Sequence, residues 1–152
     1  NRRPPRDPFN ALLSLTYTLA HAEAALALHA AGLDPCIGYY HQLSHSRESL
    51  ACDIIEAIRP LVDCICLAMV SQQVLTAEHF AHSPAGCLLG KAGRTRYYGA
   101  YEEQAAGLRQ AIRNEVKALA ERIAPDMPGP VFITPQYDGD IYDAMAASAA
   151  QP

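Results

Sequence analysis

The chain has 152 residues, of which 50% are hydrophobic and 18% are charged. This length and composition fit one globular domain with its own core and exclude a disordered chain. Because the net charge is −4, the chain as a whole does not have the basic surface of a protein that coats duplex DNA. A small basic patch at a metal site stays compatible with this charge, since phosphate contacts need only a few cations.

The cysteines are odd in number and form no C-x-x-C pair, which argues against a zinc ribbon. They are Cys36, Cys52, Cys64, Cys66 and Cys87. We expect them to be reduced and buried as small apolar side chains. No apolar segment looks long and charge-free enough to span a bilayer, and residues 1–8 do not resemble a signal peptide. These features predict a cytoplasmic protein without membrane partners.

The first helix is expected to begin at Pro8. Residues 1–7 are basic and rich in proline, which predicts an extended linker from an upstream region. Asp7 is a good N-cap and Pro8 a good first helical residue. Apolar residues occupy nearly every face of residues 9–28, which predicts a central helix. Gly32 is the expected stop.

Two helices are predicted after a loop at residues 33–49. One runs from Ser49 to about Ile58, and the next from Leu61 to about Gln73. Pro60 is expected to break the helix or to restart it, because proline lacks an amide hydrogen and clashes with the preceding turn.

A short helical turn at residues 76–80 and a hairpin within residues 84–93 are expected next, since the latter stretch carries three glycines. The last long helix is predicted over residues 94–123. Its apolar residues recur every three or four positions: Tyr98, Tyr101, Ala105, Leu108, Ile112, Val116, Leu119 and Ile123. The predicted fold is therefore mostly α, a helical bundle with one short hairpin. We expect the bundle to span residues 8–130 and residues 131–152 to form a flexible tail.

Two acidic residues share one face of the helix that begins near Ser49. Asp53 and Glu56 are three residues apart among apolar neighbours, and His41 precedes Asp53 by twelve residues. Carboxylates near a core boundary need a cation or a hydrogen-bond donor. One imidazole and one or two carboxylates can bind Mn²⁺ or Mg²⁺. By spacing alone this signal is weak, since a histidine twelve residues before an acidic helix is more often structural.

Four segments, in order, resemble the CRISPR-associated integrase, here called the Cas-one family. They are residues 3–14 (RPPRDPFNALLS), residues 31–41 (AGLDPCIGYYH), residues 49–60 (SLACDIIEAIRP), and Gly93-Arg94 leading to Tyr101-Glu102. Together they cover about residues 1 to 115. The resemblance implies the helical catalytic domain of a DNA integrase and endonuclease that inserts protospacer DNA into a CRISPR array.

The resemblance also implies roles for particular residues. In the family a Glu, a His and an Asp or Glu hold one divalent ion, Mg²⁺ or Mn²⁺. His41 matches the histidine ligand, Glu56 matches the later carboxylate ligand, and Asp53 matches a nearby acidic residue that supports catalysis. In the family reaction a 3′-OH of the protospacer attacks a phosphate at the leader–repeat boundary. Members form homodimers that flank a dimer of the small partner Cas-two.

Six basic residues are candidates for DNA contacts: Arg2, Arg3, Arg6, His21, Arg47 and Arg59. The first three lie in the predicted linker, where the alternative is a solvated segment. His21 stands where many family members carry Tyr, and it is equally well explained as a packed histidine. Arg59 has a structural alternative, an ion pair with Glu56 or Asp53.

One family feature is not found in the sequence, because the Glu ligand of the family lies upstream of the R-P-P segment. We expect the sequence to be an excerpt of a longer protein. The alternative is a truncated relative that lacks catalysis and acts as an assembly module for DNA or a partner protein. A helical metal phosphohydrolase is a third possibility, but it needs an adjacent His-Asp pair and none occurs.

Overall fold

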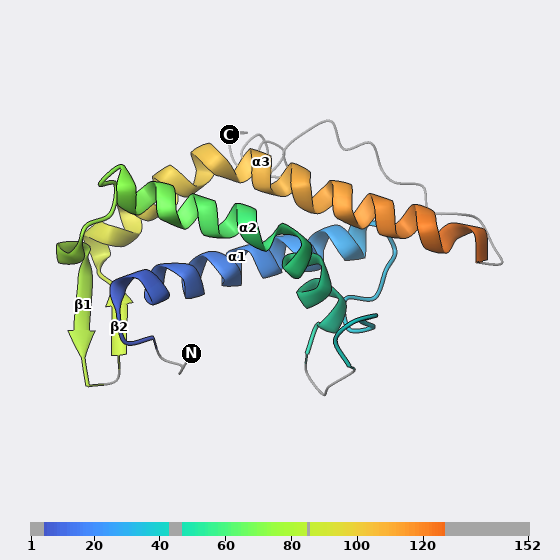
Figure 1. The fold of residues 1–152 in the computed structure, drawn as a ribbon, viewed down its shortest axis with the longest axis horizontal. Helices are drawn as coiled ribbons and strands as arrows, with labels where there is room; N and C mark the ends of the chain where they lie inside the picture. Colours follow the sequence, from blue (N-terminus) through green and yellow to red (C-terminus); the bar gives the residue numbers. More distant parts are fainter. Residues whose placement is uncertain (1–4, 43–46, 85, 127–152) are drawn as a thin grey trace, which may run out of the picture.

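Three long helices that pack against one another dominate the computed structural model, which describes residues 5–42, 47–84 and 86–126. They are α1 (Pro8–Ala30), α2 (Ser49–Ser71) and α3 (Lys91–Ile123). Figure 1 shows them side by side along the long axis of the molecule. Each helix contacts the other two. The mostly α bundle expected from the sequence is confirmed.

A small hairpin closes one end of the bundle (Figure 1). After the turn η1 (Ala77–His79), strands β1 (Phe80–Ser83) and β2 (Gly86–Leu89) pair antiparallel. The hairpin is of the expected kind but begins four residues before the predicted stretch. Consequently α3 also starts earlier than predicted, at Lys91. A last turn, η2, covers Ala124–Asp126.

Local signals set both ends of α1 as predicted. The Asp7 carboxylate accepts a hydrogen bond of 2.9 Å from the Asn10 amide, and Pro8 is the first helical residue. At the other end Gly32 has a φ of 74°, a conformation that glycine adopts without steric cost. Across it the Leu33 amide donates to the Leu28 carbonyl at 2.9 Å, which closes the helix.

The expected break at Pro60 is wrong, because α2 continues through it as one helix from Ser49 to Ser71. Pro60 is exposed, and so is Glu56, whose carbonyl loses its helical partner there. Water can therefore satisfy that carbonyl. The buried residues on either side, Ile58 and Val62, lie on the opposite face and pack into the same core. Burial on both sides of the proline keeps the two halves in line.

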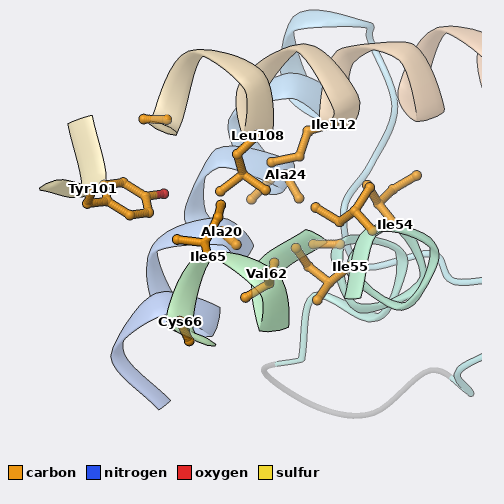
Figure 2. Close-up of a cluster of buried hydrophobic side chains, with 14 of the residues drawn as sticks. Ala20, Ala24, Ile54, Ile55, Val62, Ile65, Cys66, Tyr101, Leu108 and Ile112 are labelled. Atoms are coloured by element: carbon orange, nitrogen blue, oxygen red, sulfur yellow. The ribbon is translucent and has the colours of Figure 1, made fainter. Parts of the chain in front are cut away.

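The core lies where the three helices meet (Figure 2). It is built from small residues of α1 such as Ala20 and Ala24, branched residues of α2 such as Val62, and the inner face of α3, including Leu108 and Ile112. Small side chains on α1 let the neighbouring helices approach closely. The alanines of α1 thus contribute to the core although their side chains are small.

A polar group is buried at the hairpin end of this core. The hydroxyl of Thr16 donates to the Leu12 carbonyl at 2.9 Å and accepts from the Tyr97 hydroxyl at 3.0 Å. Cys66 lies 3.2 Å from the same hydroxyl. Tyr97 is fully buried, whereas Tyr98, which the apolar periodicity assigned to the core, is 45% exposed. Tyr97 is buried in place of Tyr98 because its hydroxyl finds a partner, the Thr16 hydroxyl, inside the core.

By length and composition α1 would pass as a membrane span, which contradicts the expectation that no such segment exists. In the structure α1 lies against both α2 and α3. Its residues Ala20, Ala24 and Leu28 are completely buried. The apolar residues of α1 therefore contribute to the core of the bundle.

Candidate functional site

The side chain of Asp53 organises the loop that precedes α2. No part of this side chain is exposed. Its Oδ2 accepts the amides of Tyr39 at 2.8 Å and Tyr40 at 3.0 Å. Its Oδ1 accepts the His41 amide at 3.0 Å and lies 2.6 Å from Nδ1 of the same residue. One buried carboxylate thus holds three consecutive loop residues.

This arrangement fixes the ring of His41. A carboxylate only accepts hydrogen bonds, so Nδ1 carries the proton that points to Asp53. In the neutral form of the ring the lone pair is then on the other nitrogen, Nε2, and the side chain is 22% exposed. Histidines that bind metals are commonly oriented in this way by a carboxylate on the far nitrogen. Asp53 therefore acts as a positioning residue for His41.

The hydrogen bonds also set the charge state of Asp53. Burial alone would raise the pKa of this carboxyl, but the bonds from the Tyr40 amide, the His41 ring and the Tyr39 and His41 amides outweigh burial and lower the pKa. The group is ionised at neutral pH. It therefore gives the loop a fixed negative charge behind the His41 ring.

Gly38 permits the close approach of the loop to α2. A Cβ at this position would lie 2.6 Å from the His41 carbonyl, 2.8 Å from the Ser49 Cβ and 2.9 Å from Oδ2 of Asp53. The loop is further tied to the first turn of α2 by the Leu50 amide, which donates to the Pro35 carbonyl at 2.7 Å. The loop backbone beside His41 is accordingly held from both sides.

Glu56, the second predicted ligand, lies one turn beyond Asp53 and is paired with Arg59. Nη1 of Arg59 is 3.1 Å from each carboxylate oxygen of Glu56, and both side chains are about half exposed. The structural alternative considered for Arg59, an ion pair with Glu56, is observed. The guanidinium also lies over the ring of Tyr17, 5.7 Å from its centroid. Asp63 accepts the Tyr17 hydroxyl at 2.6 Å.

Tyr17 itself stays neutral. Burial, followed by the hydrogen bond and the negative charge of Asp63, raises the pKa of its phenol far above the ordinary value. A neutral ring over which the guanidinium lies favours the cation electrostatically. Arg59 is consequently held between the Glu56 carboxylate and an aromatic face.

The other predicted DNA contacts come from several different segments of the chain. His21 on α1 pairs with Glu48, Nδ1 to Oε2 at 3.3 Å. Arg47 is exposed in the segment that leads into α2. Arg6 is exposed before α1, at the hairpin end, where the neighbouring Pro5 carbonyl accepts the Cys87 amide at 2.8 Å. Arg2 and Arg3 lie outside the described residues.

The donors at this site fit a divalent ion in kind but not in number. An imidazole nitrogen from His41 and a carboxylate from Glu56 suit Mn²⁺ or Mg²⁺. Within residues 5–42, 47–84 and 86–126, however, no three His, Cys, Asp or Glu side chains are grouped so that they could hold a metal. His41 and Glu56 are therefore donors of a suitable kind, but the described residues do not complete a metal site.

The sequence did not reveal how the loop is held. That the amides of Tyr39 and Tyr40 converge on Asp53 depends on a loop conformation that no local motif specifies. The one sequence signal was Gly38, three residues before His41, since a glycine without a turn role often marks a close backbone approach.

Comparisons with known proteins agree with this fold. Residues 1–103 match the family described as CRISPR associated protein Cas1. A CRISPR-associated endonuclease Cas1 of Thermodesulfovibrio yellowstonii is 42% identical over 124 residues, which are 80% of this chain and 39% of that protein. A Cas1 protein from Thermotoga maritima has a TM-score of 0.74 at 28% identity, over 82% of this chain and 42% of the other.

A further solved structure, a partial Cas6-RT-Cas1–Cas2 complex, has a TM-score of 0.73 at 27% identity. The similarity covers 88% of this chain and 43% of that one. The chain thus spans less than half the length of each of these three proteins. Since the family match covers most of the chain and the helical fold agrees, the chain belongs to the Cas1 family of CRISPR-associated proteins.

Proposed function

We propose that this chain supplies part of the metal centre of a DNA integrase and endonuclease of CRISPR adaptation. The observation that carries the proposal is the His41 ring, which the buried Asp53 carboxylate orients through Nδ1 at 2.6 Å. Membership of the Cas1 family and the endonuclease name of the Thermodesulfovibrio relative support the same conclusion.

Each residue has a distinct role in this proposal. His41 would donate the Nε2 lone pair and Glu56 a carboxylate to Mg²⁺ or Mn²⁺, while Asp53 fixes the His41 ring. A divalent ion held there would activate a 3′-OH and stabilise the charge that develops on the attacked phosphate. As a ligand, Glu56 would share its two carboxylate oxygens between the ion and Arg59. The other guanidinium nitrogens of Arg59 would then be available for a DNA phosphate.

The substrate and partners follow from the family. In the proposed reaction a protospacer 3′-OH attacks a phosphate at the CRISPR leader–repeat boundary, by transesterification. Phosphate contacts come from the basic residues Arg2, Arg3, Arg6, His21, Arg47 and Arg59. The protein acts in the cytoplasm as a homodimer with a dimer of Cas2, and the similarity to a chain from a Cas1–Cas2 complex supports this partner.

A second function is favoured by one observation. The described part of the chain contains no group of three potential metal ligands. A product that lacked further ligands would hold an ion weakly and would serve as a non-catalytic assembly module that binds DNA or a partner protein.

Strand transfer distinguishes the two functions. A short duplex with a 3′-OH is incubated with supercoiled plasmid, Mn²⁺ and Cas2, and joined products are counted. We expect the full-length gene product to be active and its His41→Ala variant to lose activity by at least about 100-fold, since metal-ligand loss removes transition-state stabilisation. The matched control is His29→Ala, an exposed histidine in the last turn of α1. A folded full-length protein without activity would support the assembly module.

A further inference from the structure

The loop beside His41 exposes an unusual amount of aromatic surface. Tyr39 is 69% exposed and Tyr40 is 79% exposed, the highest value among the large apolar side chains that the structure describes. Ile37, in the same run, is 59% exposed. Aromatic rings normally contribute to cores or interfaces, because they bury a large apolar area. Adjacent exposed rings therefore indicate a contact with another molecule.

The backbone that carries these rings is held firmly. The amides of Tyr39 and Tyr40 both donate to Oδ2 of Asp53, at 2.8 and 3.0 Å. Neither tyrosine ring takes part in these bonds. The buried carboxylate thus presents two outward-facing rings at a fixed place, which lowers the entropy that a ligand must overcome.

The rings also adjoin the group that we assign to the metal centre. The rings of Tyr40 and His41 meet edge to face, with centroids 5.5 Å apart. A ligand that covers the face of Tyr40 therefore lies next to the His41 ring. Among the contacts described, neither tyrosine side chain is hydrogen-bonded to a carboxylate.

We propose that Tyr39 and Tyr40 form a stacking surface for unpaired bases of the DNA strand whose end reaches His41. This inference rests on the proposed function, because it takes DNA as the substrate. Every base has a π face, so aromatic side chains bind single-stranded segments with little sequence preference. Stacking of the bases behind a reactive 3′ end would hold that end in place beside the His41 ring.

The chemistry of the surface favours bases over duplex phosphate. Tyrosine offers a flat apolar face and a hydroxyl but no positive charge, so it gains little from a phosphodiester backbone. A protein segment is the alternative occupant. Since such a segment would bury these rings within the folded protein, it is distinguished from DNA by its effect on stability.

The test uses the full-length gene product and a short duplex with single-stranded 3′ ends that carry 2-aminopurine. Stacking quenches this base, and binding is measured from the change in fluorescence. The variants are Tyr40→Ala, Tyr40→Phe, and the Tyr39→Ala/Tyr40→Ala pair. Tyr98→Ala is the matched control, because Tyr98 is exposed on α3 and lies outside this loop.

We expect Tyr40→Ala to raise the Kd for the overhang about five- to tenfold, and the double variant to raise it further. Tyr40→Phe and Tyr98→Ala should bind and quench like the parent protein. A fully blunt duplex should show a smaller change. The melting temperature in the absence of DNA should stay the same in all variants, since the Asp53 bonds come from the backbone.

Two results would overturn the inference while leaving the proposed function intact. One is unchanged binding and quenching by Tyr40→Ala when the parent binds. The other is a fall in melting temperature for Tyr40→Ala without DNA, absent in Tyr98→Ala, which would show that protein covers the rings. A parent protein that does not bind the duplex would overturn the proposed function and this inference together.

Discussion

Replacing Asp53 by Asn tests how much the buried carboxylate contributes. The carboxylate accepts two amides at Oδ2 and the amide and ring of His41 at Oδ1. The asparagine side chain has the same shape as aspartate. Its NH₂ group, however, must take the place of either Oδ1 or Oδ2, and there it faces groups that are themselves hydrogen-bond donors. The two hydrogen bonds at that position are lost, and the two at the remaining oxygen lose the contribution of the negative charge. We expect the free energy of unfolding to fall by about 2–4 kcal/mol.

The assay is urea denaturation of this chain at pH 7, followed by circular dichroism. Asp34→Asn is the control, since Asp34 accepts one amide, that of Cys36, at an exposed position. We expect the control to lose less than about 1 kcal/mol. A loss below about 0.5 kcal/mol for Asp53→Asn would refute the reasoning. The carboxylate would then stabilise the fold no more than the asparagine carboxamide does.

The pH dependence provides an independent check. The folded pKa of Asp53 lies below its ordinary value, so the unfolded state binds the proton more readily. Its stabilisation is therefore fully present above the unfolded pKa of about 3.9 and is lost as the pH falls through the lower folded value. The stability difference between parent and Asp53→Asn should shrink as the pH falls below about 4. A difference that grows as the pH falls would contradict this sign.

Substitutions at Gly38 and Thr16, each with a control, test the packing of the loop and the core. Gly38→Ala should destabilise the chain by about 1–3 kcal/mol, because its Cβ would meet three atoms at 2.6–2.9 Å. Gly107→Ala, whose Cβ would meet nothing within 4 Å, should stabilise α3 by about 0.5–1 kcal/mol. If urea denaturation shows the same change in stability for Gly38→Ala and Gly107→Ala, crowding at Gly38 is refuted. Thr16→Val should cost about 1–3 kcal/mol, since it leaves the buried Tyr97 hydroxyl without its acceptor. In a Tyr97→Phe background the same substitution should cost clearly less, and an additive double-mutant cycle would contradict the coupling.

Local chemistry made parts of this fold predictable. The start of α1 follows from Asp7 and Pro8, and its end from Gly32, because a cap depends on a few neighbouring residues. The pair of Glu56 and Arg59 is likewise local, since residues three apart share a helix face. Such features can be inferred from sequence before any tertiary contact is known.

Other features required contacts between distant segments. Pro60 stays inside a helix because residues on both sides of it reach one core. Tyr97 is chosen over Tyr98 because its hydroxyl meets Thr16, 81 residues away. The convergence of three loop amides on Asp53 depends on how the loop lies against α2. Periodicity and spacing carry none of this information, so these outcomes could not be predicted.

The central claim is that His41 and Glu56 hold a divalent ion, with Asp53 as the support of the His41 ring. The most direct measurement is Mn²⁺ binding to the full-length gene product, followed by electron paramagnetic resonance, in which free Mn²⁺ is counted. We predict one tight site whose Kd rises at least about tenfold in His41→Ala and in Glu56→Gln, and about tenfold or more in Asp53→Asn, as expected for a residue that orients a ligand. An unchanged Kd in His41→Ala would contradict the account.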